Sequence, residues 1–129
     1  AVEFRNREWM IEWTLQELRK NSVALCLVEG NWIPREMLFE AMKKKTADFT
    51  YSRFMGERDL TEFSEVVRPQ DVNLEIWKSE LEQLQTKSNF IYFSNFYEGF
   101  APASTQKLKQ LFGQNIVEPS LLETQKSLF

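Results

Sequence analysis

The side chains best suited to bind a small molecule lie near the ends of predicted strands. Arg53 ends an alternating strand, and its guanidinium can hold a phosphate or carboxylate through two hydrogen bonds. Tyr51 lies two residues earlier, so it shares that strand face and can flank the same ligand. Glu3 and Arg5 share a face of the first predicted strand, where they form either a salt bridge or a polar binding floor. Asn95, after the last strand, either orients a substrate oxygen or satisfies a turn.

Histidine chemistry is excluded within this chain because the sequence contains no His. Ser-His-Asp and Cys-His catalysis and His-ligated zinc are therefore ruled out. Cys26 is the single cysteine and lies in the apolar run 23–28, which is typical of a buried hydrophobe in a reducing, cytoplasmic compartment. No carboxylates show a recognisable metal-ligand spacing, so we predict no metal site. The cofactor stays unknown, and Mg²⁺ or Mn²⁺ held by carboxylates stays open.

The charge and hydropathy of the chain exclude some classes of binding partner. The chain has 129 residues and a formal net charge of −3, which argues against nonspecific binding to nucleic acid. No apolar run approaches the roughly 20 residues that a membrane helix needs, so we expect no membrane partner. A small anionic molecule fits the arginine residues better.

Strand and helix patterns alternate along the chain, and Pro34 and Pro102 lie where helices are expected to begin. Trp9, Trp13 and Trp77 have helical spacing and are expected to pack helices on the sheet. The polar stretch 57–73 is the longest connection and a candidate lid or binding loop. Strands are predicted at 1–5, 23–28, 49–54 and from 90, and helices at 8–20, from 34, from 74 and from 102.

Repeated strand–helix units predict a parallel α/β sheet with right-handed crossovers. A doubly wound sheet would need a glycine-rich turn after the first strand, and the turn here is Asn6-Arg7-Glu8. The alternative is a TIM-type barrel, of which these are four of the eight (β/α) units. We therefore predict a half barrel over residues 1–113 and an irregular tail over 114–129. Glu29 joins the residues named above at the carboxyl ends of the strands, where such barrels place their sites.

Four short stretches resemble the YecE-like family, the domain of unknown function 72, whose fold is a TIM-type barrel. The resemblance covers the whole chain and only the second half of that barrel, since a full one needs about 250 residues. The family typically carries two histidines where this chain has Met55 and Phe96, so any acid–base role of those histidines is lost here. The matching stretches are Glu3-Phe4-Arg5-Asn6 with Trp9, residues 47–53 with Gly56, Tyr92-Phe93-Ser94-Asn95 with Gly99, and Ala101-Pro102-Ala103.

Because the predicted fold is only half of a barrel, we expect the chain to associate with another protein chain. Four parallel strands leave two open edges and an uncovered apolar face, so we expect either a homo-oligomer, most simply a homodimer, or a separate N-terminal half.

The last five residues resemble the peptide with which bacterial proteins bind the sliding clamp. Gln125 would supply amide hydrogen bonds, and Leu128 and Phe129 would fill an apolar pocket. The alternative is that Leu128 and Phe129 pack under the last helix of their own domain.

Two functions remain open at this stage. The first is a binding or adaptor module tethered by its tail, which the two missing histidines favour. The second is an enzyme acting on a phosphorylated or carboxylated small molecule or a nucleic-acid component, with Arg53 as clamp and Glu3 as base.

Overall fold

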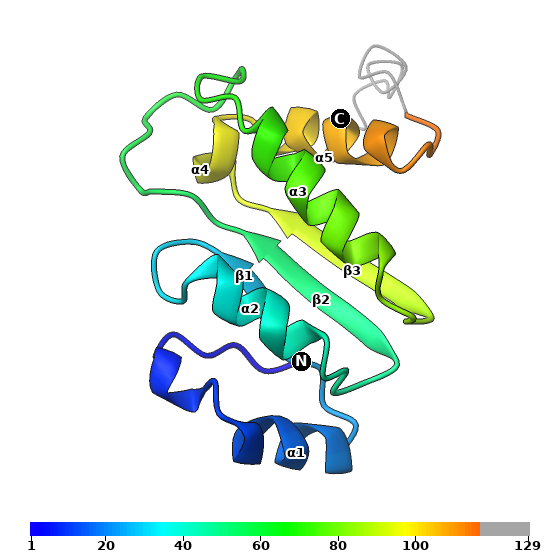
Figure 1. The fold of residues 1–129 in the computed structure, drawn as a ribbon. Coiled ribbons are helices and arrows are strands. Elements are labelled where there is room, and N and C mark those ends of the chain that lie inside the picture. Colours follow the sequence, from blue (N-terminus) through cyan, green and yellow to red (C-terminus); the bar gives the residue numbers. More distant parts are fainter. Residues whose placement is uncertain (117–129) are drawn as a thin grey trace, which may run out of the picture.

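A parallel sheet forms the centre of the structure, a computed structural model that describes residues 1–116. Its three strands are β1 (Cys26–Glu29), β2 (Phe49–Phe54) and β3 (Ser88–Phe93), in that order across the sheet. Tyr51 of β2 lies level with Cys26 on one side and Phe90 on the other. The α/β class predicted from the alternating pattern is confirmed (Figure 1).

The helices follow the strands as the sequence predicts, with one break. The expected helix 8–20 is divided because Ile11 is extended, with φ −111° and ψ 156°. An additional one-turn helix, α4, follows β3. The helical elements are a 3-10 turn (Arg7–Trp9), α1 (Glu12–Lys20), α2 (Arg35–Met42), α3 (Asp71–Glu82), α4 (Asn95–Glu98) and α5 (Ala101–Leu111).

The predicted first strand, 1–5, contributes a single bridge instead of a full strand. Val2 pairs with Leu25 in parallel, and its N–H donates to the carbonyl of Ala24 at 2.9 Å. The chain then turns away because the Asn6 side chain accepts the N–H of Glu8 and starts the 3-10 turn. The segment nevertheless lies beside β1, at the edge of the sheet opposite β3 (Figure 1).

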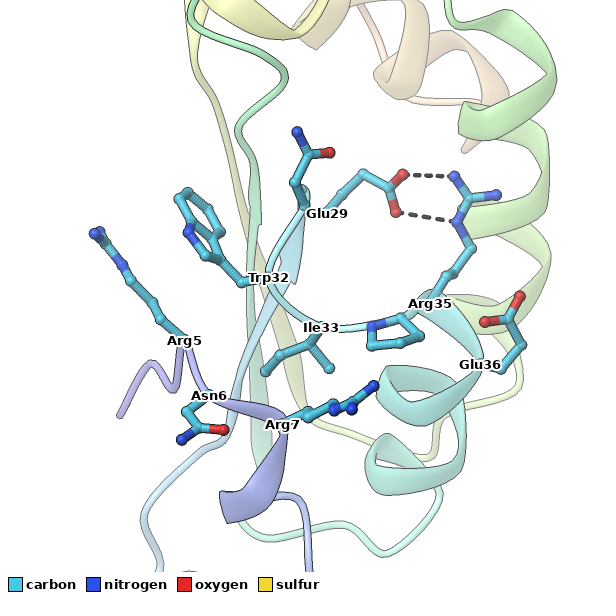
Figure 2. A pocket seen from close by; sticks show the side chains of 11 residues that line it. Arg5, Asn6, Arg7, Glu29, Trp32, Ile33, Arg35 and Glu36 are labelled. Atoms are coloured by element: carbon cyan, nitrogen blue, oxygen red, sulfur yellow. Dashed lines mark hydrogen bonds and ion pairs between the residues drawn. The ribbon is translucent and has the colours of Figure 1, made fainter.

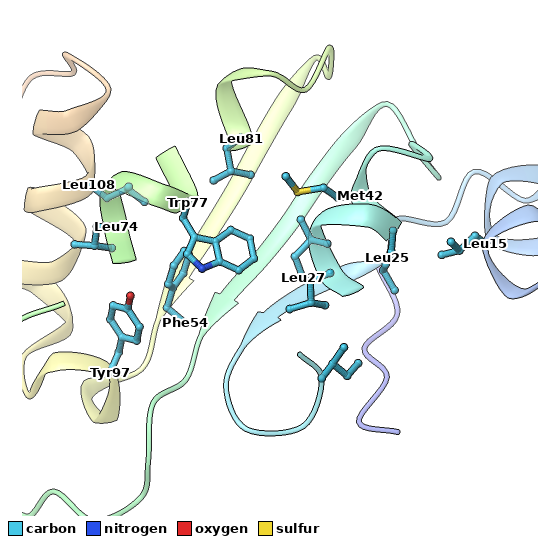
Figure 3. Packing of buried hydrophobic residues seen from close by; sticks show 13 residues of the cluster. Leu15, Leu25, Leu27, Met42, Phe54, Leu74, Trp77, Leu81, Tyr97 and Leu108 are labelled. Carbon is cyan, nitrogen blue, oxygen red and sulfur yellow. The ribbon is translucent and has the colours of Figure 1, made fainter. Parts of the chain in front are cut away.

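The hydrophobic core lies between the sheet and the helices (Figure 3). Phe54 of β2 and Trp77 of α3 are fully buried, with ring centroids 5.2 Å apart, and Leu27 and Leu38 join them from β1 and α2. The packing role predicted for Trp77 thus agrees with the structure. Trp9 is 50% exposed but stacks on Phe4 of the N-terminal segment, with ring centroids 5.7 Å apart. The expectation is wrong for Trp13, which is 63% exposed.

The other face of the sheet carries no helix among residues 1–116. Strand alternation turns Thr50, Ser52 and Phe54 toward the core, so Phe49, Tyr51 and Arg53 project from the opposite face. Tyr51 stacks on Tyr92 of β3 with ring centroids 4.9 Å apart. We call this the open face of the sheet; in a closed barrel it would be the interior.

The connection 55–70 is anchored at its end by α4. The carbonyl oxygen of Glu98 accepts the N–H groups of Val67 and Arg68 at 2.8 and 3.0 Å. Its fully buried carboxylate accepts the N–H of Gln70 at 2.7 Å, immediately before α3. At the start of the connection, a Cβ on Gly56, whose φ is +66°, would lie 2.1 Å from the Phe96 carbonyl oxygen. The predicted long loop is therefore fixed at both ends.

Candidate functional site

A cavity of about 660 Å³ lies at the carboxyl end of β1, beside residues 5–7. One wall is the segment that follows the Val2 bridge, and the other is the turn between β1 and α2. Parallel α/β proteins bind ligands at this end of their strands. Figure 2 shows three arginine side chains, Arg5, Arg7 and Arg35, around it.

Arg5 is held in place from two sides. Its Nε donates to Oε1 of Glu3 at 2.9 Å, and its guanidinium carbon lies 4.8 Å from the centre of the Trp32 ring. Arginine over an indole face gains a cation–π attraction, so Trp32 fixes the outer half of the side chain. Arg5 thus forms one ordered, cationic side of the cavity.

Arg35 closes the opposite side through a bidentate ion pair. Its Nη2 and Nε lie 2.5 and 3.1 Å from the two carboxylate oxygens of Glu29. The indole Nε1 of buried Trp77 also donates to Glu29, at 2.6 Å. Glu29 therefore ties the end of β1 to α2 and α3, and its charge is largely balanced.

Arg7 differs from the other two arginines. Within residues 1–116 its guanidinium has no hydrogen-bond or ion-pair partner, and the residue is exposed. Figure 2 shows its side chain extending from the 3-10 turn toward the start of α2. No side chain caps that helix, since Pro34 occupies the N-cap position. Arg7 and the first turn of α2 thus bring an unpaired positive charge and the positive end of a helix to one place.

The structure joins three of the five residues predicted to bind a ligand. Arg53 pairs with Oε2 of Glu3 through its Nη1, while Arg5 pairs with Oε1, so one carboxylate holds both arginines. Tyr51 lies on the same open face as Arg53, stacked on Tyr92. Asn95 is set apart: its Oδ1 accepts the N–H of Ala101 at 2.9 Å, which is a turn-stabilising contact. Of these five residues, only Arg5 lines the cavity.

The electrostatics of Glu3 follow from this pairing. Burial alone would raise the pKa of its carboxyl, but the hydrogen bonds from Arg5 and Arg53 outweigh it and hold the pKa below the usual value. A carboxylate with a lowered pKa is a weak base. Cys26 of β1 is buried near Glu3. Burial, together with the negative charge of Glu3, raises the pKa of the Cys26 thiol to about 11.

A second, smaller cavity of about 210 Å³ adjoins the first, since residues 29–31 line both. Its cation, Arg68, is already paired with Asp59 at 2.5 Å and lies 3.8 Å from Glu57. Gln70 and Tyr97 form further parts of its wall. The larger cavity is the one that offers an unpaired cation.

Comparison with known proteins places the chain in a family. The family model described as "Protein of unknown function DUF72" matches residues 1–127. The chain belongs to the DUF72 family. No curated protein matched.

A solved structure agrees with the DUF72 assignment. The chain superposes on the crystal structure of a DUF72 family protein from Thermotoga maritima MSB8 with a TM-score of 0.67 and 23% sequence identity. The match covers 88% of this chain and 46% of that protein, so the chain spans less than half the length of this relative. That protein has a TIM-like fold, and the three parallel strands described here are a partial (β/α) arrangement of the same kind.

Several expectations for this DUF72 chain are not tested by the described residues. Gln125, Leu128 and Phe129 lie outside residues 1–116.

Across 1–116, no group of three or more Cys, Asp or Glu side chains is placed to hold a metal ion. No helix in that range is long and apolar enough to cross a membrane.

Sequence reasoning missed most of the cavity. Arg7, Trp32 and Arg35 were not predicted as site residues, because they lie in short turns or at the start of a helix and not in strands. The available signal was their position: each follows closely the carboxyl end of a predicted strand, which is where parallel (β/α) units gather functional side chains.

Proposed function

We propose that this DUF72 chain binds a small molecule that carries a phosphate or carboxylate group, in the cavity between residues 5–7 and the start of α2. The observation that carries the proposal is Arg7, an arginine at the cavity without an ionic partner among residues 1–116. A guanidinium recognises phosphate and carboxylate with paired hydrogen bonds.

The cationic groups around Arg7 support an anionic ligand, and among residues 1–116 they outnumber the one exposed carboxylate at the cavity, that of Glu36. The N-terminal end of α2 carries partial positive charge from its free backbone N–H groups. Arg5 adds a second guanidinium, which Trp32 orients and Glu3 partly neutralises. The carboxylate of Glu29 is engaged by Arg35 and Trp77, so it repels an incoming anion less than a free carboxylate would.

Binding is favoured over catalysis by the state of Glu3. The base assigned to Glu3 in the enzyme hypothesis needs a pKa near the working pH. Arg5 and Arg53 instead hold the pKa of Glu3 below its usual value. Arg53 is itself paired with Glu3, so the clamp that we propose is Arg7, with Arg53 as a supporting residue. A binding module therefore remains our preferred interpretation, with the enzyme as the alternative.

Titration calorimetry with inorganic phosphate and with malonate tests this proposal. We expect saturable binding of at least one of the two anions, weakened about tenfold by Arg7→Ala, which corresponds to about 1.4 kcal/mol. The matched control is Arg58→Ala, because Arg58 is also exposed and without a partner among residues 1–116 but does not line the cavity. Equal binding by the two variants, or no binding of either anion by the wild-type chain, would contradict the proposal.

A further inference from the structure

The second cavity, of about 210 Å³, is built by segments that follow the three strands of the sheet. Gly30 and Asn31 belong to the turn after β1, and Gly56 and Glu57 begin the connection after β2. Tyr97 of α4, which follows β3, forms another part of the wall. The cavity volume equals the liquid volume of roughly seven water molecules, which is enough for part of a small organic ligand.

The main charged groups of the second cavity are already paired. Both carboxylate oxygens of Glu29 are engaged by Arg35, and the indole of Trp77 also donates to this carboxylate. Arg68 is paired with Asp59 at 2.5 Å. An anion that entered this cavity would find no unpaired cation among the described residues of its wall. The cavity therefore favours an uncharged polar group.

Uncharged hydrogen-bonding groups remain free in the wall. The side-chain amide of Asn31 has no hydrogen-bond partner among residues 1–116. The hydroxyl of Tyr97 is buried and unpartnered within the same range. Burial and the charge of nearby Glu29 raise the pKa of this hydroxyl, so it stays protonated at neutral pH and can donate. An alcohol group, which both donates and accepts, matches an amide and a phenol of this kind.

The two cavities meet at residues 29–31, which line both of them. Gly30 has no side chain at this boundary, and a Cβ there would lie 3.1 Å from the ring of Trp32. Backbone and the amide of Asn31 thus form the boundary on this side. A ligand whose anionic group binds beside Arg7 can therefore extend across Gly30 into the second cavity.

From these features we infer that the second cavity holds the hydroxyl groups of the same ligand whose anionic group binds beside Arg7. The ligand is then a phosphorylated or carboxylated polyol. This inference rests on the proposed function, because the anionic group anchors the ligand in the first cavity. In the complex, Asn31 hydrogen-bonds a hydroxyl group near the boundary, and Tyr97 donates to one beside α4.

An alkyl chain fits the second cavity less well than a polyol. It would cover the amide of Asn31 and leave the buried hydroxyl of Tyr97 without a partner, and both effects are unfavourable. A site that hydrogen-bonds a ligand hydroxyl discriminates against an analogue that lacks this group. The preference for hydroxyl groups is therefore the property to measure.

Titration calorimetry of the complete 129-residue chain with two matched pairs of ligands tests the inference. Glucitol 6-phosphate and hexyl phosphate have the same carbon chain and the same phosphate, and they differ only in their hydroxyl groups. Gluconate and hexanoate are the corresponding carboxylates. We expect the hydroxylated member of at least one pair to bind about tenfold or more tightly than its partner. The pair that shows this preference distinguishes a phosphate from a carboxylate ligand.

Two variants locate the preference in the second cavity. Asn31→Ala and Tyr97→Phe should each lower the ratio of the two dissociation constants about threefold or more, since each removes one hydrogen bond to the ligand. The matched controls are Asn115→Ala and Tyr92→Phe, which remove the same groups from positions that line neither cavity. Both controls should keep the wild-type ratio. Circular dichroism checks the fold of each variant, and Asn31→Ala decides alone if Tyr97→Phe does not fold.

The possible failures are distinguishable. If no ligand of either pair binds, the proposed function fails and this inference fails with it. If both members of a pair bind equally and Arg7→Ala weakens both, the proposed function stands and this inference is overturned. A preference for hydroxyl groups that Asn31→Ala and Tyr97→Phe both leave intact would place those groups elsewhere and would overturn it as well.

Discussion

Arg53 in β2 and Glu3 near the N-terminus form an ion pair on the open face of the sheet, although 50 positions separate them in the sequence. The Glu3 side chain is only 18% exposed, and its second oxygen is held by Arg5 at 2.9 Å. The pair fastens the N-terminal segment, which has one backbone bridge to β1, to the centre of the sheet. Its loss should therefore be measurable as a loss of stability.

Arg53→Ala should lower the free energy of unfolding by about 1 kcal/mol, because the partly buried Glu3 loses a charged hydrogen-bond partner. In a double-mutant cycle with Glu3→Gln, the combined loss should be smaller than the sum of the single losses. Urea denaturation measures all three variants. Arg58→Ala removes the same charge from an exposed, unpaired position and should cost less than about 0.5 kcal/mol. Strict additivity of the cycle would show that the two side chains do not interact.

The stability of the wild-type chain should fall more steeply in acid than that of Glu3→Gln. The folded pKa of Glu3 is lowered from its ordinary value of 4.5, so the folded state favours the ionised form. This contribution to stability is complete above the unfolded pKa and is lost as the pH falls through the lower folded pKa. Urea midpoints of both proteins between about pH 3 and pH 6 measure the difference. Parallel curves would mean that Glu3 has an ordinary pKa in the folded state.

Phe54→Ala should destabilise the fold by about 3–5 kcal/mol because it opens a cavity in the core. Phe54 is fully buried and its ring contacts those of Trp77, Phe93 and Tyr97, with centroids 4.7 to 5.2 Å away. Phe49→Ala removes the same side chain from the open face and should cost clearly less. Thermal unfolding of both variants provides the comparison, and equal losses would contradict the assignment of the two faces.

Deleting Leu128 and Phe129 should abolish binding to a bacterial sliding clamp and leave the melting temperature unchanged. This proposal rests on the sequence alone, where Gln125 supplies hydrogen bonds and the two apolar residues supply most of the affinity. Surface plasmon resonance with an immobilised clamp should give a micromolar dissociation constant, about −8 kcal/mol. Packing of the tail on its own domain predicts the opposite: a lower melting temperature after truncation and no clamp binding.

The strand pattern predicts most of the architecture because its signals are local. The alternation in residues 49–54 and the continuous apolar run of residues 23–28 mark β2 and β1 without any knowledge of the rest of the fold. The same local reasoning predicts that Trp13 packs its helix on the sheet, whereas Trp13 is 63% exposed. Periodicity identifies an apolar face, but it does not tell whether another element covers that face.

The candidate site was harder to predict because its pairings are long-range. Sequence reasoning placed Glu3, Arg5 and Arg53 at one polar end, which agrees with the ion pairs. It did not indicate that one carboxylate would engage both arginines and leave Arg7 at the cavity without an ionic partner among residues 1–116. Asn95 was chosen for its polar amide, whose oxygen instead accepts a backbone N–H of the next helix, a local contact that spacing alone does not distinguish.

The contact between Glu98 and Gln70 has a consequence for the order in which the chain gains its structure. The N-terminus of α3 has no side-chain cap of its own and depends on a carboxylate 28 positions later, which Lys107 of α5 also contacts at 2.8 Å. Because that carboxylate belongs to α4, the first turn of α3 gains this hydrogen bond only once β3 and α4 have formed beside it. The amides of Gln70 and of the residues 67–68 should therefore gain protection from hydrogen exchange together with α4, as one cooperative unit of late folding.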